Sequence, residues 1–515
     1  MWWSSPVRAT RRRRRLVTAS CRSTTRWWRA WRSRGDAKPR RYEAVSVPPV
    51  SVVAAEAATV CGGRLAAGRA KQPIGRVSID SRTLRRGELF IAIRGARFDG
   101  HDFVAAALAA GAMGAIVDAA HRAPAVGADQ VVIVVDDTTR ALQRIASHVR
   151  RQSGARVVAI TGSVGKTTTK DVTAALLAMR YRTFRNEGNL NNHIGLPLSL
   201  LELTSRPDVA VVELGMSAPG EIRRLVEISE PNVRVWTNVG PAHLEFFDSV
   251  DAIADAKAEI CEQADASTEL VANADDARVM ARIGGFPGHT ITFGLDQPAH
   301  VQATDIEDGG LRGMRANVDV GGRRASIETP LIGRGNLANV LAAIAVADAF
   351  AVPLADVTER VRTLTPAAHR GEVFTNWSGV TVVDDAYNSS PLALERALQT
   401  LGAEPRAVRR VAVLGEMFEL GEASETLHRA AGRVVVECGI ARLVTVGGAA
   451  ARALGEAAIE AGLPPTAVTH TATSDEAGHL VATLVAPGDV VLVKGSRGVR
   501  LERVVERLKG SRGAG

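Results

Sequence analysis

The amino-acid sequence predicts an α/β protein of three domains, in which a small N-terminal α/β domain precedes a central parallel-sheet domain and a Rossmann-like C-terminal domain. Two observations predict this fold class. Short, nearly continuous apolar segments alternate with helical patterns along most of the 515 residues, as expected for strands buried on both faces of a parallel sheet. At roughly 100–200 residues per domain, the length beyond the first 50 residues suits about three domains.

The first predicted domain covers residues 51–150. Its strand candidates are Val77–Arg82 and Gly87–Ile93, because apolar and polar residues alternate there as on a half-buried strand. An alanine-rich helix is expected from Phe103 to Ala110.

The central domain is expected over residues 151–364. Its predicted strands are Arg156–Ile160, Val209–Val212 and Val233–Trp236, and a helix from Asn336 to about Phe350 is expected near its end.

The C-terminal domain is expected over residues 365–515. Its predicted strands are Val380–Val383, Val411–Leu414, Leu443–Val446 and Val490–Val493, with helical stretches between them. This alternation predicts a mostly parallel, Rossmann-like sheet.

The positive charge of the chain is concentrated at its beginning. The sequence has 64 Lys and Arg, 55 Asp and Glu, and a formal net charge of +9. Residues 1–50 contain 14 of the basic and 2 of the acidic residues, so the other 465 residues carry a net charge of −3. An organelle transit peptide or a nucleic-acid-binding arm could share this composition, but we expect a disordered basic extension, because the segment has no periodic apolar face. The mildly acidic remainder has no motif that reads RNA or DNA, so we expect no nucleic-acid partner.

The sequence also predicts a cytoplasmic protein without integral membrane contact. The longest apolar stretch, Ala338–Ala355, is interrupted by Asp348 and is not expected to span a membrane. The four cysteines are scattered without metal-ligand spacing, which favours free thiols in a reducing compartment.

The strongest local signal is the segment Thr161–Thr169, which reads Thr-Gly-Ser-Val-Gly-Lys-Thr-Thr-Thr between a predicted strand and a predicted helix. Backbone N–H groups of such a turn converge on phosphate oxygens at the positive end of a helix dipole. Lys166 would neutralise the γ-phosphate and the Thr167 hydroxyl would ligate Mg²⁺, whereas a plain glycine turn is the alternative. Ile160 stands where the general P-loop has its first glycine, so the shorter loop argues against a GTPase or an ordinary ATPase.

Two residues follow predicted strands at the sheet edge where ligands of parallel α/β folds collect. Glu213 ends the strand Val209–Val212 and could ligate the same Mg²⁺ as Thr167, although a solvated glutamate at a strand end is an equal alternative. His243 follows Val233–Trp236, and spacing alone does not separate a ligand from a structural histidine.

Lys257 stands at an unusual position for a lysine. It completes the series Val250, Ile253, Lys257 and Ile260, which is one face of a helix of 3.6-residue period. Burial there would depress its pKa and produce a reactive neutral amine, whereas a lysine that extends past the apolar stripe to water is the alternative.

Taken in order, the motifs resemble those of the Mur ligases of peptidoglycan synthesis over about residues 73–508. The motifs are Asp80-Ser81-Arg82, Asp99-Gly100-His101, Thr161–Thr168, Asn189–Asn192, Glu213–Gly215, Asn238 with His243, Asp384–Asn388 and Lys494–Arg497. The last two indicate the family member that adds D-alanyl-D-alanine. The diamino-acid-adding ligase remains the alternative, but its Asp-Asn-Pro-Arg motif is absent from the sequence.

The resemblance implies a small substrate domain, a P-loop ATPase-like central domain and a Rossmann-like ligase domain. It also implies that ATP phosphorylates the terminal carboxylate of UDP-MurNAc-tripeptide and that D-alanyl-D-alanine attacks the acyl phosphate, giving UDP-MurNAc-pentapeptide, ADP and phosphate. Two Mg²⁺ ions would stabilise the transition state. A monomer is expected from the family.

The resemblance further implies roles for individual residues. The nucleotide contacts would be Gly162, Ser163, Val164, Gly165, Lys166, Thr167 and Thr168, with Asn336 at adenine, Arg370 at the γ-phosphate and Asp385 at the ribose. The Mg²⁺ ligands would be Thr167, Glu213, His243 and Lys257, the last as a carbamate, and the catalytic residues would be Lys166, Lys257, His243 and Arg370. Substrate contacts would be Ser81 and Arg82 at the UDP end, Asn189 and Asn192, and Asn388, Lys494 and Arg497 near the dipeptide.

The sequence departs from the family pattern at two places. The usual Gly-x-His-Asn of the adenine motif is Gly333-Arg334-Gly335-Asn336, which removes an imidazole from the base pocket. The usual Asn-Ala-Asn-Pro is Asn388-Ser389-Ser390-Pro391. Neither change affects a phosphate or metal residue, so we expect an active enzyme.

Overall fold

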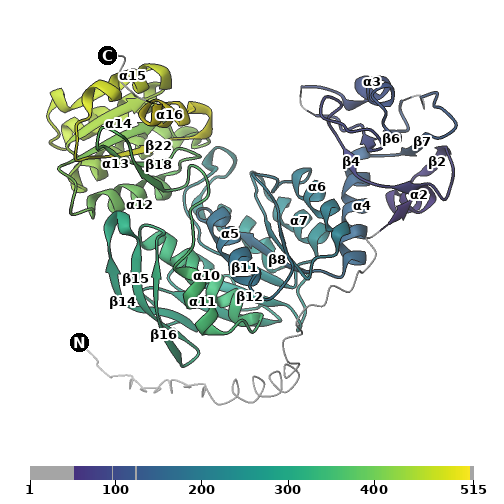
Figure 1. Cartoon of the computed structure of the whole chain (residues 1–515), viewed down its shortest axis with the longest axis horizontal. Coiled ribbons are helices and arrows are strands. Elements are labelled where there is room, and N and C mark those ends of the chain that lie inside the picture. The colour runs from purple at the N-terminus through teal and green to yellow at the C-terminus, as the bar shows by residue number, and fades with distance from the viewer. Residues whose placement is uncertain (1–50, 96, 122–123, 511–515) are drawn as a thin grey trace, which may run out of the picture. The chain divides into compact units, whose positions relative to one another are not determined.

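The computed structural model describes residues 51–95, 97–121 and 124–510 (Figure 1). The predicted basic extension over residues 1–50 lies outside the described residues. Within the described ranges, three large sheets each draw their strands from one continuous stretch of the chain, which confirms the α/β fold class.

The N-terminal sheet has five strands in the order β2-β7-β6-β5-β4, and β1 and β3 form a separate antiparallel pair. The strands are β1 (Val52–Val53), β2 (Arg64–Ala67), β3 (Pro73–Ile74), β4 (Val77–Ser78), β5 (Leu89–Ile91), β6 (Gly114–Asp118) and β7 (Val131–Val135). The helices are α2 (Ala54–Cys61), α3 (Val104–Ala109) and α4 (Thr138–Ser153), with a 3-10 turn at Gly100–Phe103.

The predicted strand Val77–Arg82 is wrong in its second half. The strand ends at Ser78 because the Asp80 carboxylate accepts a hydrogen bond from the Arg82 backbone N–H at 3.0 Å and closes a turn. The other predicted strand of this domain is present in shortened form as β5.

The central sheet has nine strands in the order β16-β15-β14-β13-β12-β11-β8-β10-β9. The strands are β8 (Arg156–Thr161), β9 (Thr183–Arg185), β10 (Val209–Glu213), β11 (Val233–Trp236), β12 (Glu269–Asn273), β13 (His289–Gly294), β14 (Val301–Asp308), β15 (Met314–Val320) and β16 (Arg323–Thr329). The helices are α5 (Lys166–Leu177), α6 (Gly195–Leu201), α7 (Glu221–Ser229), α8 (Val250–Ala258), α9 (Ala277–Met280), α10 (Arg334–Ala349) and α11 (Leu354–Val361), with 3-10 turns at Glu202–Ser205, Leu244–Phe246, Glu259–Cys261 and Gly310–Arg312.

Helices cover both faces of the parallel part of this sheet. Side chains of α5 and α10 pack with Val158 and Ile160 of β8 on one face, and side chains of α4, α6 and α7 pack with Val157 and Ala159 on the other. Figure 1 shows α5 and α10 close to β11 and β8. The continuous apolar run of β8 is therefore buried on both faces, as its composition predicts.

The strand order changes side at β8, because β10 pairs with one edge of β8 and β11 with the other, both parallel to it. Residues that follow the carboxyl ends of β8, β10 and β11 therefore meet at one edge. Such a switch point is where ligands of open α/β sheets bind.

The antiparallel hairpin strands β14, β15 and β16 extend the central sheet and were not expected from the sequence. Along β15 buried and exposed residues alternate, so only one face is apolar. Such an alternating strand lacks the continuous apolar run that marked the predicted strands of the central domain.

The C-terminal sheet has six strands in the order β17-β18-β22-β19-β20-β21, all parallel except the edge strand β17. The strands are β17 (Glu372–Thr375), β18 (Thr381–Asp385), β19 (Arg409–Gly415), β20 (Arg442–Val446), β21 (Val468–Thr471) and β22 (Asp489–Lys494). The helices are α12 (Pro391–Gly402), α13 (Ser424–Glu437), α14 (Ala449–Glu460), α15 (Ser474–Leu484) and α16 (Glu502–Gly510), with 3-10 turns at Gly421–Ala423, Pro465–Ala467 and Arg497–Val499.

Helix α4 runs past the predicted domain boundary at residue 150 and ends at Ser153. None of the helices within residues 51–510 that the structure describes is both long enough and apolar enough to cross a membrane. Cys61, Cys261 and Cys438 are free thiols, in agreement with the sequence prediction for these three cysteines.

Candidate active site

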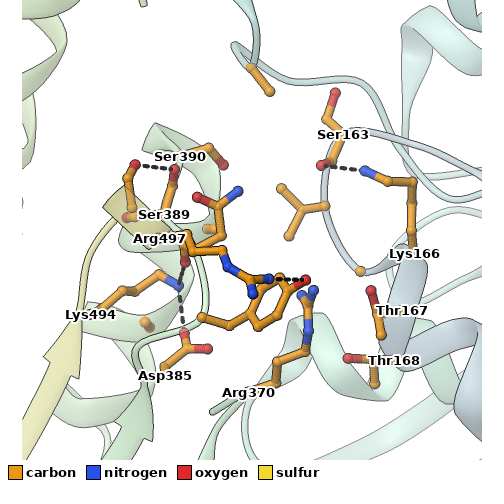
Figure 2. A pocket seen from close by; sticks show the side chains of 18 of the residues that line it. Ser163, Lys166, Thr167, Thr168, Arg370, Asp385, Ser389, Ser390, Lys494 and Arg497 are labelled. Carbon is orange, nitrogen blue, oxygen red and sulfur yellow. Dashed lines mark hydrogen bonds and ion pairs between the residues drawn. The ribbon is translucent and has the colours of Figure 1, made fainter. Parts of the chain in front are cut away.

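A single cavity of about 660 Å³ collects nearly all of the predicted site residues. The predicted residues that line it are Ser163, Val164, Gly165, Lys166, Thr167, Thr168, Asn189, Asn192, Glu213, His243, Lys257, Asn336, Arg370, Asp385, Asn388, Lys494 and Arg497. Figure 2 shows Lys166 and Thr167 on one side of this cavity and Asp385, Lys494 and Arg497 on the other. Gly162, Ser81 and Arg82 are the predicted residues that do not line it.

The glycines of the phosphate loop are required by close approach as well as by backbone angle. Gly162 and Gly165 have φ of 151° and 86°. A Cβ at Gly162 would lie 2.0 Å from the Thr237 hydroxyl, and a Cβ at Gly165 would lie 2.3 Å from the Asn339 side-chain oxygen. Both positions therefore exclude any side chain.

The middle of the loop is fixed by the segment after β11. The Val164 N–H donates to the Asn238 side-chain oxygen at 2.9 Å, and the Asn238 amide donates to the Val164 carbonyl at 2.9 Å. The Ser163 hydroxyl likewise donates to the Gly240 carbonyl at 3.1 Å and accepts from the Gly240 N–H at 2.9 Å. Ser163 and Val164, two of the predicted phosphate contacts, are thus hydrogen-bonded within the protein. The N–H groups of the first turn of α5 remain as phosphate donors.

Lys166 folds back over its own loop. Its ammonium donates to the Gly162 carbonyl at 2.8 Å and to the Ser163 carbonyl at 3.3 Å. Figure 2 shows the Lys166 side chain turned toward Ser163. Burial lowers its pKa, the nearby Glu213 carboxylate opposes that change, and the charge of Arg370 reinforces it. The ammonium is thus held at the loop close to a second cation.

Glu213 is buried, so the alternative of a solvated strand end is wrong. Its side chain is only 4% exposed and accepts a hydrogen bond from the Thr167 hydroxyl at 2.7 Å and another from the Asn191 amide at 2.8 Å. A carboxylate and a hydroxyl in direct contact provide hard oxygen donors of the kind that Mg²⁺ prefers.

Lys257 is also buried, so the alternative of a lysine extending to water is wrong. The residue is 1% exposed, and within the described residues its ammonium has no hydrogen-bond partner. Burial lowers its pKa well below the usual value, the charge of Lys166 adds to this effect, and Glu213 opposes it. The site therefore favours the neutral amine.

His243 faces the C-terminal domain. Its Nδ1 lies 2.5 Å from a carboxylate oxygen of Glu419, and the Glu419 carbonyl accepts a hydrogen bond from the Glu245 N–H at 3.1 Å. The hydrogen bond with His243 lowers the pKa of Glu419. A carboxylate on Nδ1 leaves Nε2 as the ring nitrogen that can ligate a metal.

Asn336 lies in the first turn of α10 and is held within that turn. Its amide donates to the Ile332 carbonyl at 2.9 Å, and its oxygen accepts from the Asn339 amide at 3.2 Å. One donor hydrogen and one acceptor lone pair of the Asn336 amide can therefore still serve a ligand.

Lys494 contacts Asp385 rather than open space in the cavity. Its buried ammonium donates to the Asp385 carboxylate at 2.6 Å and to the Asn388 carbonyl at 3.0 Å. It joins the end of β18 to the loop that follows and orients Asp385.

Tyr387 lies beside two arginines. The Arg370 guanidinium carbon lies 4.0 Å from the ring centroid, the Arg497 guanidinium carbon lies 5.2 Å from it, and Arg497 donates to the Tyr387 hydroxyl at 3.1 Å. Within the described part of the chain, neither guanidinium has a carboxylate partner, so both can attract an anionic ligand.

The predicted asparagines differ in their contacts. The Asn192 oxygen accepts from the N–H groups of Ile194 at 3.1 Å and of Gly195 at 2.8 Å, where α6 begins. Asn189 lines the cavity, and within the described residues its side chain has no hydrogen-bond partner.

Ser81 and Arg82 belong to the N-terminal domain. The Arg82 guanidinium binds the Asp80 carboxylate at 2.6 Å and lowers its pKa to about 2. Nearby, Nε2 of His101 accepts a hydrogen bond from the Asp118 N–H at 3.0 Å, and its Nδ1 donates to the Asp99 carboxylate at 2.6 Å, so both ring nitrogens are engaged within the protein.

Comparison with known proteins identifies the family. Residues 160–347 match the Mur ligase middle domain, residues 369–497 the Mur ligase glutamate ligase domain, and residues 73–150 the Mur ligase family catalytic domain. The chain belongs to the Mur ligase family.

Relatives of this Mur ligase include the UDP-N-acetylmuramoyl-tripeptide--D-alanyl-D-alanine ligase of Bacillus subtilis, which is 34% identical over 84% of this chain and 92% of its own. The crystal structure of MurF from Acinetobacter baumannii is 30% identical with a TM-score of 0.81 and matches over 90% of this chain and 100% of its own. The MurF ligase of Thermotoga maritima in complex with ADP is 30% identical with a TM-score of 0.74, over 84% of this chain and 97% of its own.

The sequence did not single out two residues that support this Mur ligase site. Asn191 holds the Glu213 carboxylate, whereas its neighbours Asn189 and Asn192 were predicted as substrate contacts. Glu419 contacts His243 from a position 176 residues further along the chain, a separation that no local spacing signals.

The close approach of Asn339 to Gly165 predicts how much a side chain at position 165 would destabilise the fold. Gly165 and Gly220 share nearly the same φ, 86° and 84°, but a Cβ at Gly220 would meet nothing within 4 Å. We expect Gly220→Ala to cost about 1–2 kcal/mol in free energy of unfolding through backbone strain alone. Gly165→Ala should cost about 1–3 kcal/mol more, because the added methyl group overlaps Asn339.

Urea unfolding followed by circular dichroism measures both variants, and Gly165→Ala combined with Asn339→Ala should recover part of the extra loss. Equal losses for the two single variants would contradict the proposed overlap.

Proposed function

We propose that this chain joins D-alanyl-D-alanine to UDP-MurNAc-tripeptide at the expense of ATP, forming UDP-MurNAc-pentapeptide, ADP and phosphate in peptidoglycan precursor synthesis. One observation carries the proposal: a single cavity contains the phosphate loop, the buried Glu213 and Lys257, and the Tyr387–Arg497 cluster of the C-terminal domain. The names of the Bacillus subtilis and Acinetobacter baumannii relatives support the substrates, and the ADP complex of the Thermotoga maritima relative supports ATP.

Two covalent steps complete the reaction. A carboxylate oxygen of the tripeptide attacks the γ-phosphorus, the bond to the β,γ-bridging oxygen breaks, and ADP leaves. The dipeptide amine then attacks the carbonyl carbon of the acyl phosphate, phosphate leaves from the tetrahedral intermediate, and the amine loses a proton. Lys166 and Arg370 stabilise the charge of the transferred phosphoryl group, because Lys166 is held at the loop and Arg370 lines the same cavity with its charge acting on Lys166.

The donor set suits Mg²⁺. Thr167 and Glu213 form one oxygen site, and Nε2 of His243 with a carbamate on Lys257 would complete a second. Bound Mg²⁺ would supply electrostatic stabilisation of the phosphoryl oxygens.

The lowered pKa of Lys257, which is caused first by burial, suits carbamylation of this side chain. An ammonium there would repel both a metal cation and Lys166, whereas a neutral amine can add CO₂, lose a proton and become an anion. The side chain has no competing hydrogen-bond partner among the described residues, so the amine is free to react.

The remaining predicted residues position the substrates. Asn336 contacts adenine and Asp385 the ribose, with Lys494 orienting Asp385. Asn388 and Arg497 lie near the dipeptide, and Asn189 and Asn192 lie near the tripeptide.

The N-terminal domain binds the UDP end through Ser81 and Arg82. We place the monomeric enzyme in the cytoplasm, where ATP and nucleotide-linked precursors are available.

Coupling of ATP hydrolysis to both acceptors tests the reaction. We expect phosphate release only when UDP-MurNAc-tripeptide and D-alanyl-D-alanine are both present, because the acyl phosphate forms on one and is consumed by the other. A coupled assay of phosphate release measures this. Release that is indifferent to either substrate would refute the proposal, and activity with a diamino acid in place of the dipeptide would favour the diamino-acid-adding ligase.

The contact of Lys494 with Asp385 predicts that a change at Lys494 alters the KM for ATP and not the KM for the dipeptide. Lys494→Met should raise the KM for ATP about tenfold or more, because a hydrogen bond between charged groups contributes roughly 1.5–3 kcal/mol. The KM for D-alanyl-D-alanine should change little. Steady-state kinetics with each substrate varied in turn measure the split, and a change confined to the dipeptide would place Lys494 at that substrate instead.

Carbamylation of Lys257 has a direct spectroscopic test. We expect one carbamate carbon signal in the ¹³C NMR spectrum of protein equilibrated with ¹³C-bicarbonate, and no such signal for Lys257→Met. Lowering the pH should weaken the signal as the amine becomes protonated. Lys170→Met is the matched control, since Lys170 is equally buried but donates to the Asn186 carbonyl at 2.8 Å. A signal that persists in Lys257→Met would contradict the assignment.

A further inference from the structure

One arginine of the cavity has no assigned role. Arg396 lies on α12 and lines the cavity, and within the described residues its guanidinium makes no hydrogen bond or ion pair. Burial lowers its pKa, and the carboxylates of Asp276 and Glu395 only oppose that effect from a distance. The Asp276 carboxylate already accepts N–H groups of Val239, Arg278 and Val279.

The Arg396 side chain lies over the backbone of Gly335. A Cβ at Gly335 would lie 3.1 Å from Cδ, 3.5 Å from Nη1 and 3.7 Å from Nε of Arg396. Gly335 precedes Asn336 in the first turn of α10. The guanidinium thus occupies the space into which a side chain at position 335 would project.

The same part of the cavity has apolar walls. Ile332 precedes α10, and Ala397 and Leu401 follow Arg396 along α12. The hydroxyl of Thr400 lies 2.3 Å from a Cβ built at Gly333, so the two helices are close together there. A flat apolar ring fits between aliphatic side chains and a guanidinium plane.

The contacts of Arg396 differ from those of the lysine at the phosphate loop. The Arg396 side chain lies over Gly335, the residue before Asn336, whereas the Lys166 ammonium donates to the carbonyls of Gly162 and Ser163.

We propose that Arg396 binds the purine ring of the nucleotide by stacking its guanidinium on the ring, in the space left by the glycine at position 335. The inference rests on the proposed placement of adenine at Asn336. A guanidinium over an aromatic face attracts it through the ring's π-electrons, and this attraction is larger where water is excluded. Arg396 thus recognises the base of a nucleotide and not its phosphates.

Binding measurements with and without a base test this role. We expect Arg396→Ala in the full chain to weaken ATP binding about tenfold, as measured by titration calorimetry, and to leave the affinity for inorganic tripolyphosphate unchanged. Arg396→Lys should not restore ATP binding, because the ammonium lacks the plane. Arg429→Ala is the control for loss of an arginine, since Arg429 pairs with Glu460 on α14, and it should bind ATP normally.

Three outcomes would overturn the proposal: unchanged ATP affinity of Arg396→Ala, an equal loss of tripolyphosphate binding, or full recovery by Arg396→Lys. Asn336→Ala separates the role of Arg396 from the placement of adenine on which that role rests. If it weakens ATP binding and Arg396→Ala does not, adenine lies as proposed and the role of Arg396 alone fails. If neither variant changes ATP affinity, the placement of adenine fails as well.

Gly335→Leu gives a second test that does not remove the arginine. The new side chain would displace the guanidinium, so we expect the same loss of ATP affinity as for Arg396→Ala and no further loss in the double variant. No loss in the single variant, or two fully additive losses, would overturn the proposal.

Discussion

The hydrogen bond between Thr167 and Glu213 joins the first turn of α5, which follows β8, to the end of β10. It depends on the parallel register of β8 and β10, which sets Glu213 opposite Ile160, the second-last residue of β8 before the loop. The Glu213 carboxylate is the negative charge that acts on both Lys166 and Lys257. This one side chain therefore opposes the effect of burial on the pKa of both lysines.

The sequence was sufficient for part of the parallel sheets, since the predicted strands correspond to β8, β10 and β11 of the central sheet and to β18, β19, β20 and β22 of the C-terminal sheet, whereas the parallel strands β12 and β13 were not predicted. Strands such as Val233–Trp236 are buried on both faces and are recognisable as short apolar runs. The strands β14 to β16 escaped prediction because only one of their faces is buried, so polar residues interrupt each run. The turn at Asp80 was missed because a side-chain hydrogen bond, rather than composition, ends the strand.

The site was predictable where its chemistry is local in sequence. The spacing of the phosphate loop and the place of Lys257 on a helical stripe led to residues that do line the cavity. The contacts that decide how those residues act were not predictable, because they join distant segments. Lys494 meets Asp385 across 109 residues, and His243 meets Glu419 across 176. Only the adjacency of strands and helices in the folded chain brings such pairs together.

Tyr387 affects how anions bind to the arginines of the cavity. Arg370 and Arg497 both lie against this tyrosine, whose ring face carries partial negative charge and whose hydroxyl accepts a hydrogen bond from Arg497. Many of the described surface arginines, such as Arg223 with Glu262, sit in ion pairs that an incoming ligand would first have to break. At Tyr387 the two guanidinium groups are held in place by an aromatic ring, so an anion can reach them without competing against a carboxylate.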